Sequence, residues 1–239
     1  MVFTGGRGAS SASSGGRSAS GAKTFDDLRT YMQDHYGIAV DHSIDKLDFE
    51  TVKQGIAGVD DVLKQLPQLR QSIKTISADM STTAYAFARA RYGANGLEFS
   101  LHLGGWAYGS STKMRDSLKR DGTFHPANMD ARGIMSHEVG HIAEFTIAKK
   151  HGSSAGESFR YIKKQTYATK IVGDACKDVK RTSYGRGKKN DQLVSGISGY
   201  ASRNRSEALA EAVGDYMTNG SKSNPLSQSI WAKIKNELG

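Results

Sequence analysis

The spacing of apolar residues predicts a mainly helical protein with one clear strand. The helical spacing, an apolar side chain every three or four positions, recurs over 24–36, 48–77 with a break near Pro67, 82–91, 131–150, 155–182, 204–218 and 227–238. Residues 97–103 (LEFSLHL) alternate apolar and polar side chains, as a half-buried strand does. The glycine-rich stretch 104–126 is expected to be a loop with a short helix near 114–118. The expected fold class is α+β, mainly helical with a small β-sheet.

Composition divides the chain into three parts. Residues 1–23 are mostly glycine, serine, alanine and arginine, which bury too little surface to offset the entropy lost on ordering, so we predict a flexible Gly/Ser-rich arm. Residues 24–92 are expected to form an N-terminal helical region. Residues 93–239 form the domain that carries the motifs described below.

The net charge of +9 is concentrated in one segment. Residues 149–189 hold twelve basic and three acidic side chains, so this segment alone carries +9. Such a segment docks nucleic acid or an acidic partner, or it is a solvated helix face followed by a loop. The single cysteine excludes an intramolecular disulfide and a cluster of thiolate metal ligands.

Targeting signals are sparse in this sequence. No apolar run approaches the roughly 20 residues that a membrane span needs. The first ten residues, MVFTGGRGAS, lack the basic and apolar regions of a Sec signal. We therefore expect a cytoplasmic or virion-associated protein, with export by a route other than Sec left open.

The informative motif is HEVGH at residues 137–141. Residues four apart share one face of a helix, so the imidazoles of His137 and His141 can bind one metal ion with Glu138 beside them. Apolar residues occupy the opposite side of this helix. Zn²⁺ suits two neutral imidazoles and a carboxylate, with a fourth position open for water. The alternative is a pair of surface histidines with no metal.

A third ligand must come from elsewhere in the chain. Glu207 and Glu211 share one face of the predicted helix 204–218, and the small residues Ala210 and Gly214 beside them would allow a second helix to approach closely. Two carboxylates four residues apart repel each other unless a cation or an imidazole N–H faces them. The alternative is the exposed acidic face of an ordinary amphipathic helix.

HEVGH, followed by a tyrosine, six residues and Glu-x-x-x-Glu-Ala, resembles the catalytic domain of anthrax lethal factor and its relatives. These are gluzincin-type zinc metallopeptidases with a zincin-like α+β fold, and similar domains occur in phages and other mobile elements. The resemblance covers about 95–220. It implies three zinc ligands, which are His137, His141 and Glu207.

The same resemblance assigns three further roles. It implies that Glu138 is the general base, that Tyr200 stabilises the transition state and that Glu211 orients a ligand histidine. The expected function is a zinc-dependent endopeptidase that hydrolyses a protein or peptide through a metal-activated water. Two alternatives stay open: a phage virion or assembly protein that keeps the metallopeptidase-like fold as a binding module, and a basic protein that binds nucleic acid through 149–189.

Four residues or segments outside the motifs carry smaller expectations. His125 is a candidate wall of the active site, whereas Glu144 and His102 are expected to face solvent. The strand 97–103 either pairs with an extended substrate or is an ordinary core strand.

Overall fold

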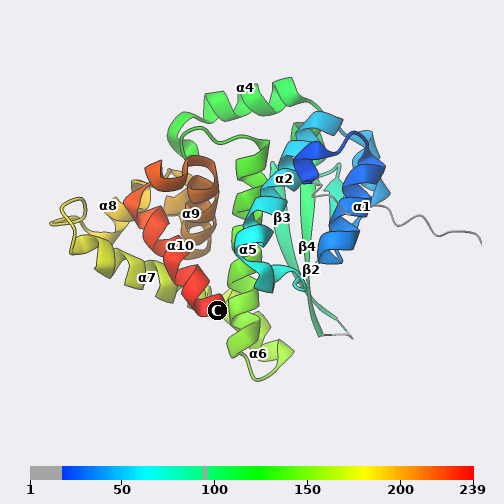
Figure 1. Ribbon diagram of the computed structural model, residues 1–239. Coiled ribbons are helices and arrows are strands. Elements are labelled where there is room, and N and C mark those ends of the chain that lie inside the picture. Colours follow the sequence, from blue (N-terminus) through cyan, green and yellow to red (C-terminus); the bar gives the residue numbers. More distant parts are fainter. Residues whose placement is uncertain (1–17, 94–95) are drawn as a thin grey trace, which may run out of the picture.

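The computed structural model describes residues 18–93 and 96–239 (Figure 1). Residues 1–17 of the predicted arm lie outside the described residues. Its last residues pack on the core: Ala19–Gly21 form a 3₁₀ turn, Ala19 is fully buried, and the Ala19 N–H donates to Asp60 at 3.4 Å. Residues 19–22 therefore belong to the folded body and not to a flexible arm.

Helices and strands follow the α+β expectation. The α-helices are α1 Phe25–Tyr36, α2 Phe49–Gln65, α3 Gly105–Tyr108, α4 Ser111–Asp121, α5 Ala131–His151, α6 Ala155–Lys163, α7 Thr166–Lys180, α8 Asn190–Ser195, α9 Arg205–Asn219 and α10 Pro225–Leu238. The strands are β1 Ala39–Val40, β2 Ile73–Asp79, β3 Ala86–Gly93 and β4 Gly96–Gly104. A mainly helical α+β fold with a small sheet is thus confirmed.

The sheet has the order β1-β2-β4-β3. Strands β1, β2 and β4 are parallel to one another, and β3 runs antiparallel to β4. The regions 24–92 and 93–239 therefore contribute to one sheet. The apolar positions of β4 that the sequence predicts face the core, with Phe99, Leu101 and Leu103 buried.

Two helices expected from the sequence are wrong. Residues 82–91 do not form a helix, because Ala86–Gly93 is strand β3, in which Ala86, Ala88 and Ala90 lie opposite core residues of β4. Alanine favours helices locally, but pairing with β4 outweighs that preference here. The end of the expected helix 48–77 is strand β2, which begins at Ile73.

The stretch 104–126 is more helical than expected. It contains α3 and the whole of α4, whose first turn is capped by the Ser110 hydroxyl accepting from the Lys113 N–H at 3.4 Å. In Figure 1, α4 lies across the top of the molecule, above the N-terminal end of α5.

Helix α5 lies at the centre of the fold. It packs against α2, β3 and β4 on one side and α9 on the other, so that it separates the sheet from α7, α9 and α10 (Figure 1). Asp130 caps its start by accepting from the Gly133 N–H at 2.9 Å. A helix surrounded in this way is buried on nearly all sides, and its polar residues must therefore find partners inside the protein.

Small residues bring α5 and α9 close together, as the sequence predicts. A β-carbon placed on Gly140 would lie 2.8 Å from Cα of Ala210 and 3.2 Å from Cβ of Val213. On α9, a β-carbon on Gly214 would lie 3.4 Å from Cβ of His137. The two helices that carry the motifs are therefore in direct backbone contact.

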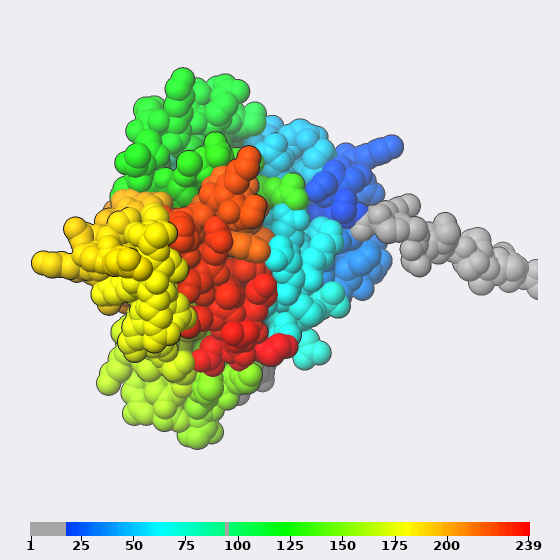
Figure 2. Space-filling view, turned by 60° about the vertical axis from the view of Figure 1, so that its left-hand side comes forward, coloured from blue at the N-terminus to red at the C-terminus, as the bar shows by residue number. Residues whose placement is uncertain are grey.

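The basic segment 149–189 covers the end of α5, α6, α7 and the loop that follows. Figure 2 shows its last part, around 175–190 in yellow, standing out from the surface beside α10 in red. Some of its charge is paired, as in Lys170–Glu237 at 3.0 Å and Lys177–Asp174 at 2.9 Å. Within residues 18–93 and 96–239, the helices are too short or too polar to cross a membrane.

Candidate metal centre

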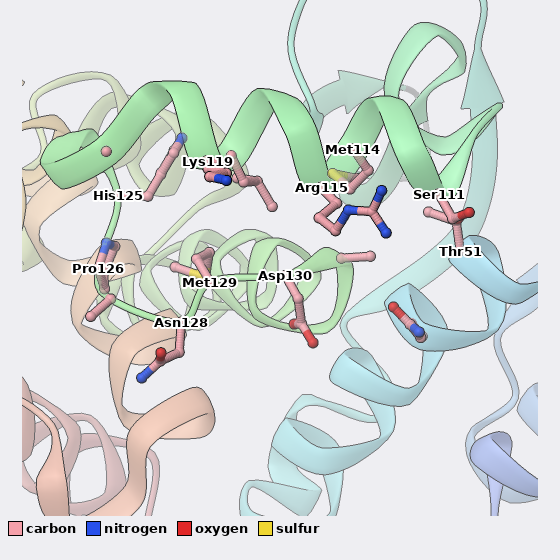
Figure 3. Close-up of a pocket in the computed structure, with 15 residues that line it drawn as sticks. Thr51, Ser111, Met114, Arg115, Lys119, His125, Pro126, Asn128, Met129 and Asp130 are labelled. Carbon is pink, nitrogen blue, oxygen red and sulfur yellow. The ribbon is translucent and has the colours of Figure 1, made fainter.

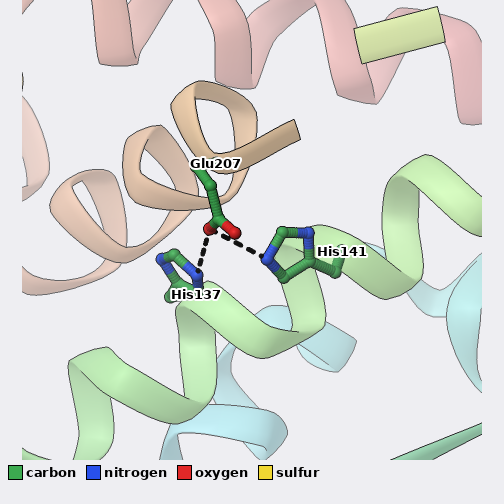
Figure 4. A group of neighbouring side chains, drawn as sticks. All are labelled: His137, His141 and Glu207. Atoms are coloured by element: carbon green, nitrogen blue, oxygen red, sulfur yellow. Dashed lines mark ion pairs between the residues drawn. The ribbon is translucent and has the colours of Figure 1, made fainter. Parts of the chain in front are cut away.

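Three side chains from α5 and α9 converge on one point (Figure 4). Nε2 of His137 and Nε2 of His141 each lie 3.3 Å from Oε2 of Glu207. One ligand atom from each residue lies within 4.8 Å of the other two, which is close enough to share a single ion. The two histidines sit one turn apart on α5, and α9 supplies the carboxylate.

The start of α9 fixes the position of Glu207. Asn204 precedes the helix, and its side-chain oxygen accepts from the Glu207 N–H at 2.9 Å. Glu207 therefore lies in the first turn. Burial would raise the pKa of Glu207, but the imidazoles of His137 and His141 hold it below its ordinary value. Glu207 is an anion facing the two imidazoles.

Glu211 supports His137 from behind. Oε1 of Glu211 lies 2.8 Å from Nδ1 of His137, and the Ser198 hydroxyl donates to Oε2 at 2.6 Å. Glu211 is fully buried; burial would raise its pKa, but the imidazoles of His125 and His137 lower it to about 2. The negative charge of Glu211 at this distance favours a proton on Nδ1, although the two atoms are not aligned as a hydrogen bond, and this leaves the Nε2 lone pair of His137 facing Glu207.

A serine and a second glutamate support His141 in the same way. The Ser206 hydroxyl lies 3.1 Å from Nδ1 of His141 and donates to the carboxylate of Glu144. A hydroxyl has one hydrogen, so while Glu144 accepts it, the N–H must belong to His141. The expectation that Glu144 faces solvent is wrong, because it is 1% exposed and lies between α5 and α9.

These contacts allow a test of whether the site suits a metal ion. In the neutral imidazoles, both Nε2 lone pairs face Oε2 of Glu207, a buried atom that accepts no hydrogen bond from any residue in the described part of the chain. Three electron-pair donors facing one another repel unless a cation or a proton lies between them. Two imidazoles and a carboxylate are the ligands of a catalytic Zn²⁺ site with an open position.

A proton competes with the metal for the same place. Burial lowers the pKa of His137, but Glu207 and Glu211 outweigh burial and raise it well above its ordinary value. Metal ligands must be deprotonated, so metal binding here would release this proton.

A pocket of about 370 Å³ opens beside the site, and of the three candidate ligands His137 lines it. His137, Glu138 and Tyr200 line it. Glu138 is buried, and burial raises its pKa, although the two imidazoles and the Ala88 N–H of β3 oppose this. Burial and the nearby carboxylates raise the pKa of Tyr200 to about 12, so its hydroxyl keeps its proton at neutral pH.

His125 forms part of the wall of this pocket, as expected. It is buried, its ring centroid lies 5.5 Å from that of Tyr200, and its Nδ1 lies 3.3 Å from Oε1 of Glu211. His125 also lines a separate pocket of about 500 Å³. Figure 3 shows this second pocket below α4, with Asn128 and Asp130 on the side away from this helix. It contains none of the three candidate ligands.

The structure decides between the two alternatives for the strand 97–103 and corrects the expectation about His102. The strand lies in β4, between β2 and β3, so both of its edges are paired and it is an ordinary core strand. His102 is half-buried and not solvated: its ring nitrogens lie 2.9 Å from Oγ of Ser77 and 2.8 Å from Oγ of Ser100.

The structure thus brings together all six site residues expected from the motifs and adds Glu144 and Ser206. Glu144 stands three residues after His141, and Ser206 directly precedes Glu207, so proximity in sequence was the available signal. The chain was also compared with known proteins. No protein-family model, no curated protein and no solved structure matches it, so the residues themselves carry the functional argument.

Proposed function

We propose that this chain is a zinc-dependent endopeptidase of the gluzincin type. The observation that carries the proposal is the convergence of His137, His141 and Glu207 beside a pocket that also presents Glu138. A binding module has no need of a buried carboxylate next to the open side of a metal site. When bound, zinc supplies the positive charge that polarises a peptide carbonyl and lowers the pKa of water towards about 7.

Two side chains of the pocket perform the proton chemistry. Glu138 accepts a proton from the attacking water and delivers it to the leaving amine. The Tyr200 hydroxyl, which keeps its proton, donates a hydrogen bond to the oxygen that becomes negative in the transition state. Glu211 and the Glu144–Ser206 pair hold the two imidazoles with their Nε2 atoms towards Glu207.

An extended peptide can reach this pocket along β3. Within the described residues, β3 pairs with β4 alone, which leaves its other edge without a strand partner. Ala86, the first residue of β3, lines the pocket together with Thr83 and Ala84. Main-chain pairing along such an edge binds a peptide with little demand on its sequence.

The test is a metal analysis of the purified protein combined with cleavage of a peptide library, with and without a chelator. We expect about one zinc per chain and cleavage that the chelator abolishes. Glu138→Gln should abolish cleavage while zinc remains bound, because its carboxylate accepts the proton but does not ligate the metal. Retained cleavage in this variant would remove Glu138 from the role of base, and zinc without any cleavage would favour the binding module.

Tyr200→Phe tests the second role. We expect kcat to fall about 10²–10³-fold with a smaller change in KM, the usual effect of removing one oxyanion donor. A change in KM alone would show that Tyr200 contacts the substrate without stabilising the transition state.

A further inference from the structure

An unpaired guanidinium stands at the pocket beside the candidate metal ligands. Arg203 ends the short 3₁₀ helix Tyr200–Arg203, and it lines the same pocket as His137 and Glu138. The Arg203 side chain is exposed, and within residues 18–93 and 96–239 no carboxylate lies within ion-pair distance of it. By contrast Arg205, two positions on, pairs with Asp191 at 3.0 Å.

Two aromatic rings hold Arg203 in place. Its guanidinium carbon lies 4.7 Å from the ring centroid of Tyr200 and 5.3 Å from that of Phe124. These rings are themselves 5.1 Å apart, and the ring of Tyr200 lies 5.8 Å from that of His137. A guanidinium stacked in this way is pre-organised, so it loses less freedom when it binds a ligand.

The rest of the pocket has no second cation of this kind. Arg203 is the one arginine or lysine among its described lining residues, whose side chains are otherwise aromatic, aliphatic, small or part of the site already described. Glu138, buried in the same pocket, would repel any anion that lacked a compensating positive charge. Apart from the proposed metal ion, which would polarise the scissile carbonyl, Arg203 is therefore the positive charge that an anionic group of the substrate meets in this pocket.

We propose that Arg203 is a specificity-determining residue that binds a carboxylate of the peptide substrate. This inference rests on the proposed peptidase function. A carboxylate matches the planar fork of a guanidinium and forms two parallel hydrogen bonds with it, while the guanidinium keeps its contacts with the rings of Tyr200 and Phe124. The carboxylate has two sources, an acidic side chain close to the scissile bond or the free C-terminus of the substrate.

The experiment uses one fluorogenic peptide frame and the full-length, zinc-loaded protein. Glu, Gln and Lys are placed in turn at each position around the cleaved bond, and each peptide is made with a C-terminal acid and with a C-terminal amide. We expect Glu to exceed Gln in kcat/KM by about tenfold at one position, the effect of one charge-assisted contact. If the acid form exceeds the amide by this factor while the Glu scan is flat, the source is the C-terminus.

Variants assign this preference to Arg203. Arg203→Ala should remove the preference, Arg203→Lys should keep part of it, and Arg203→Glu should reverse it in favour of Lys. Arg181→Ala removes an exposed arginine that does not line the pocket and should leave the preference unchanged. Unfolding by circular dichroism checks that each variant is folded.

A binding measurement separates this inference from the proposed function. Fluorescence anisotropy of the labelled Glu, Gln, acid and amide peptides is measured on the Glu138→Gln variant, with and without Arg203→Ala. If no peptide is cleaved by the wild type, hydrolysis fails as the function, and tighter binding of the carboxylate peptide that depends on Arg203 still supports the site. Equal affinities, or a preference that persists without Arg203, overturn the inference.

Discussion

Removing the charge of Glu211 should weaken zinc binding without touching a ligand. Glu211 is fully buried, and its Oε1 lies 2.8 Å from Nδ1 of His137. Glu211→Gln keeps the volume and one oxygen that can accept from Nδ1, so it removes the charge and the second acceptor, which faces the Ser198 hydroxyl. Glu211→Met has a similar volume but removes both the charge and the acceptor, which frees the imidazole to place its proton on Nε2.

The size of the effect follows from this difference. Residues that orient a ligand histidine typically contribute 10–100-fold to metal affinity, or about 1.4–2.8 kcal/mol. We expect Glu211→Gln to lie near tenfold, because the tautomer of His137 is retained. We expect Glu211→Met to lie near 100-fold, because the lone pair on Nε2 is no longer secured.

Competition with a chromophoric zinc chelator at pH 7 measures both values. Glu98→Gln is the control, because Glu98 is an exposed residue of β4 that does not belong to the site. The zinc affinity of this variant should equal that of the wild type. Both variants must remain folded by circular dichroism. Zinc affinities within about twofold of the wild type in two folded variants would refute the claim that Glu211 orients His137.

Three further predictions concern the ligand, the helix contact and a buried carboxylate. Glu207→Gln should lower zinc affinity by more than about 100-fold in the same chelator assay. Residues that only orient a ligand contribute up to roughly 100-fold, whereas Glu207 is a proposed ligand itself. Gly140→Ala should lower the free energy of unfolding in urea by about 1–3 kcal/mol, because the new β-carbon would lie 2.8 Å from Cα of Ala210. The control Gly173→Ala, in open space on α7, should raise the free energy of unfolding by about 0.5–1 kcal/mol. Equal effects of the two substitutions would contradict the close contact between α5 and α9. Burial would raise the pKa of Asp60, but hydrogen bonds from Lys64 and two buried tyrosines lower this pKa. The ionised carboxylate therefore stabilises the protein above about pH 4, and this stabilisation is lost as the pH falls through the pKa of Asp60 in the folded state. Asp60→Asn should therefore cost about 1.5–3 kcal/mol at pH 7 and less at pH 3, and an equal difference at both pH values would contradict this.

The parts of the fold that depend on local sequence were predictable. The expected helices 131–150 and 204–218 correspond to α5 and α9, because each has a regular apolar pattern and a capping residue, Asp130 or Asn204, before it. Strand β3 was missed, since its alanines favour a helix and only pairing with β4 makes it a strand. That pairing is not encoded in any short stretch of sequence.

The residues of the candidate site likewise fall into those predictable from local sequence and those that depend on packing. HEVGH places two imidazoles on one helix face by periodicity alone, and the spacing of Glu207 and Glu211 places two carboxylates on another. The roles of Glu144 and Ser206 follow from the packing of α5 against α9, which sets their distance from each other. Such partners are visible only once the two helices are placed together.

The separation of the ligands along the chain has a consequence for synthesis. Glu207 stands 66 positions after His141, so at about 5–20 residues per second a ribosome delivers the third ligand roughly 3–13 s after the second. During that interval the sheet and α5 can already be in place, while the two histidines lack the carboxylate that completes the site. If the site binds zinc as we propose, metal binding in a nascent chain would follow the synthesis of residue 207, and any activity would appear later than the folding of the sheet and α5.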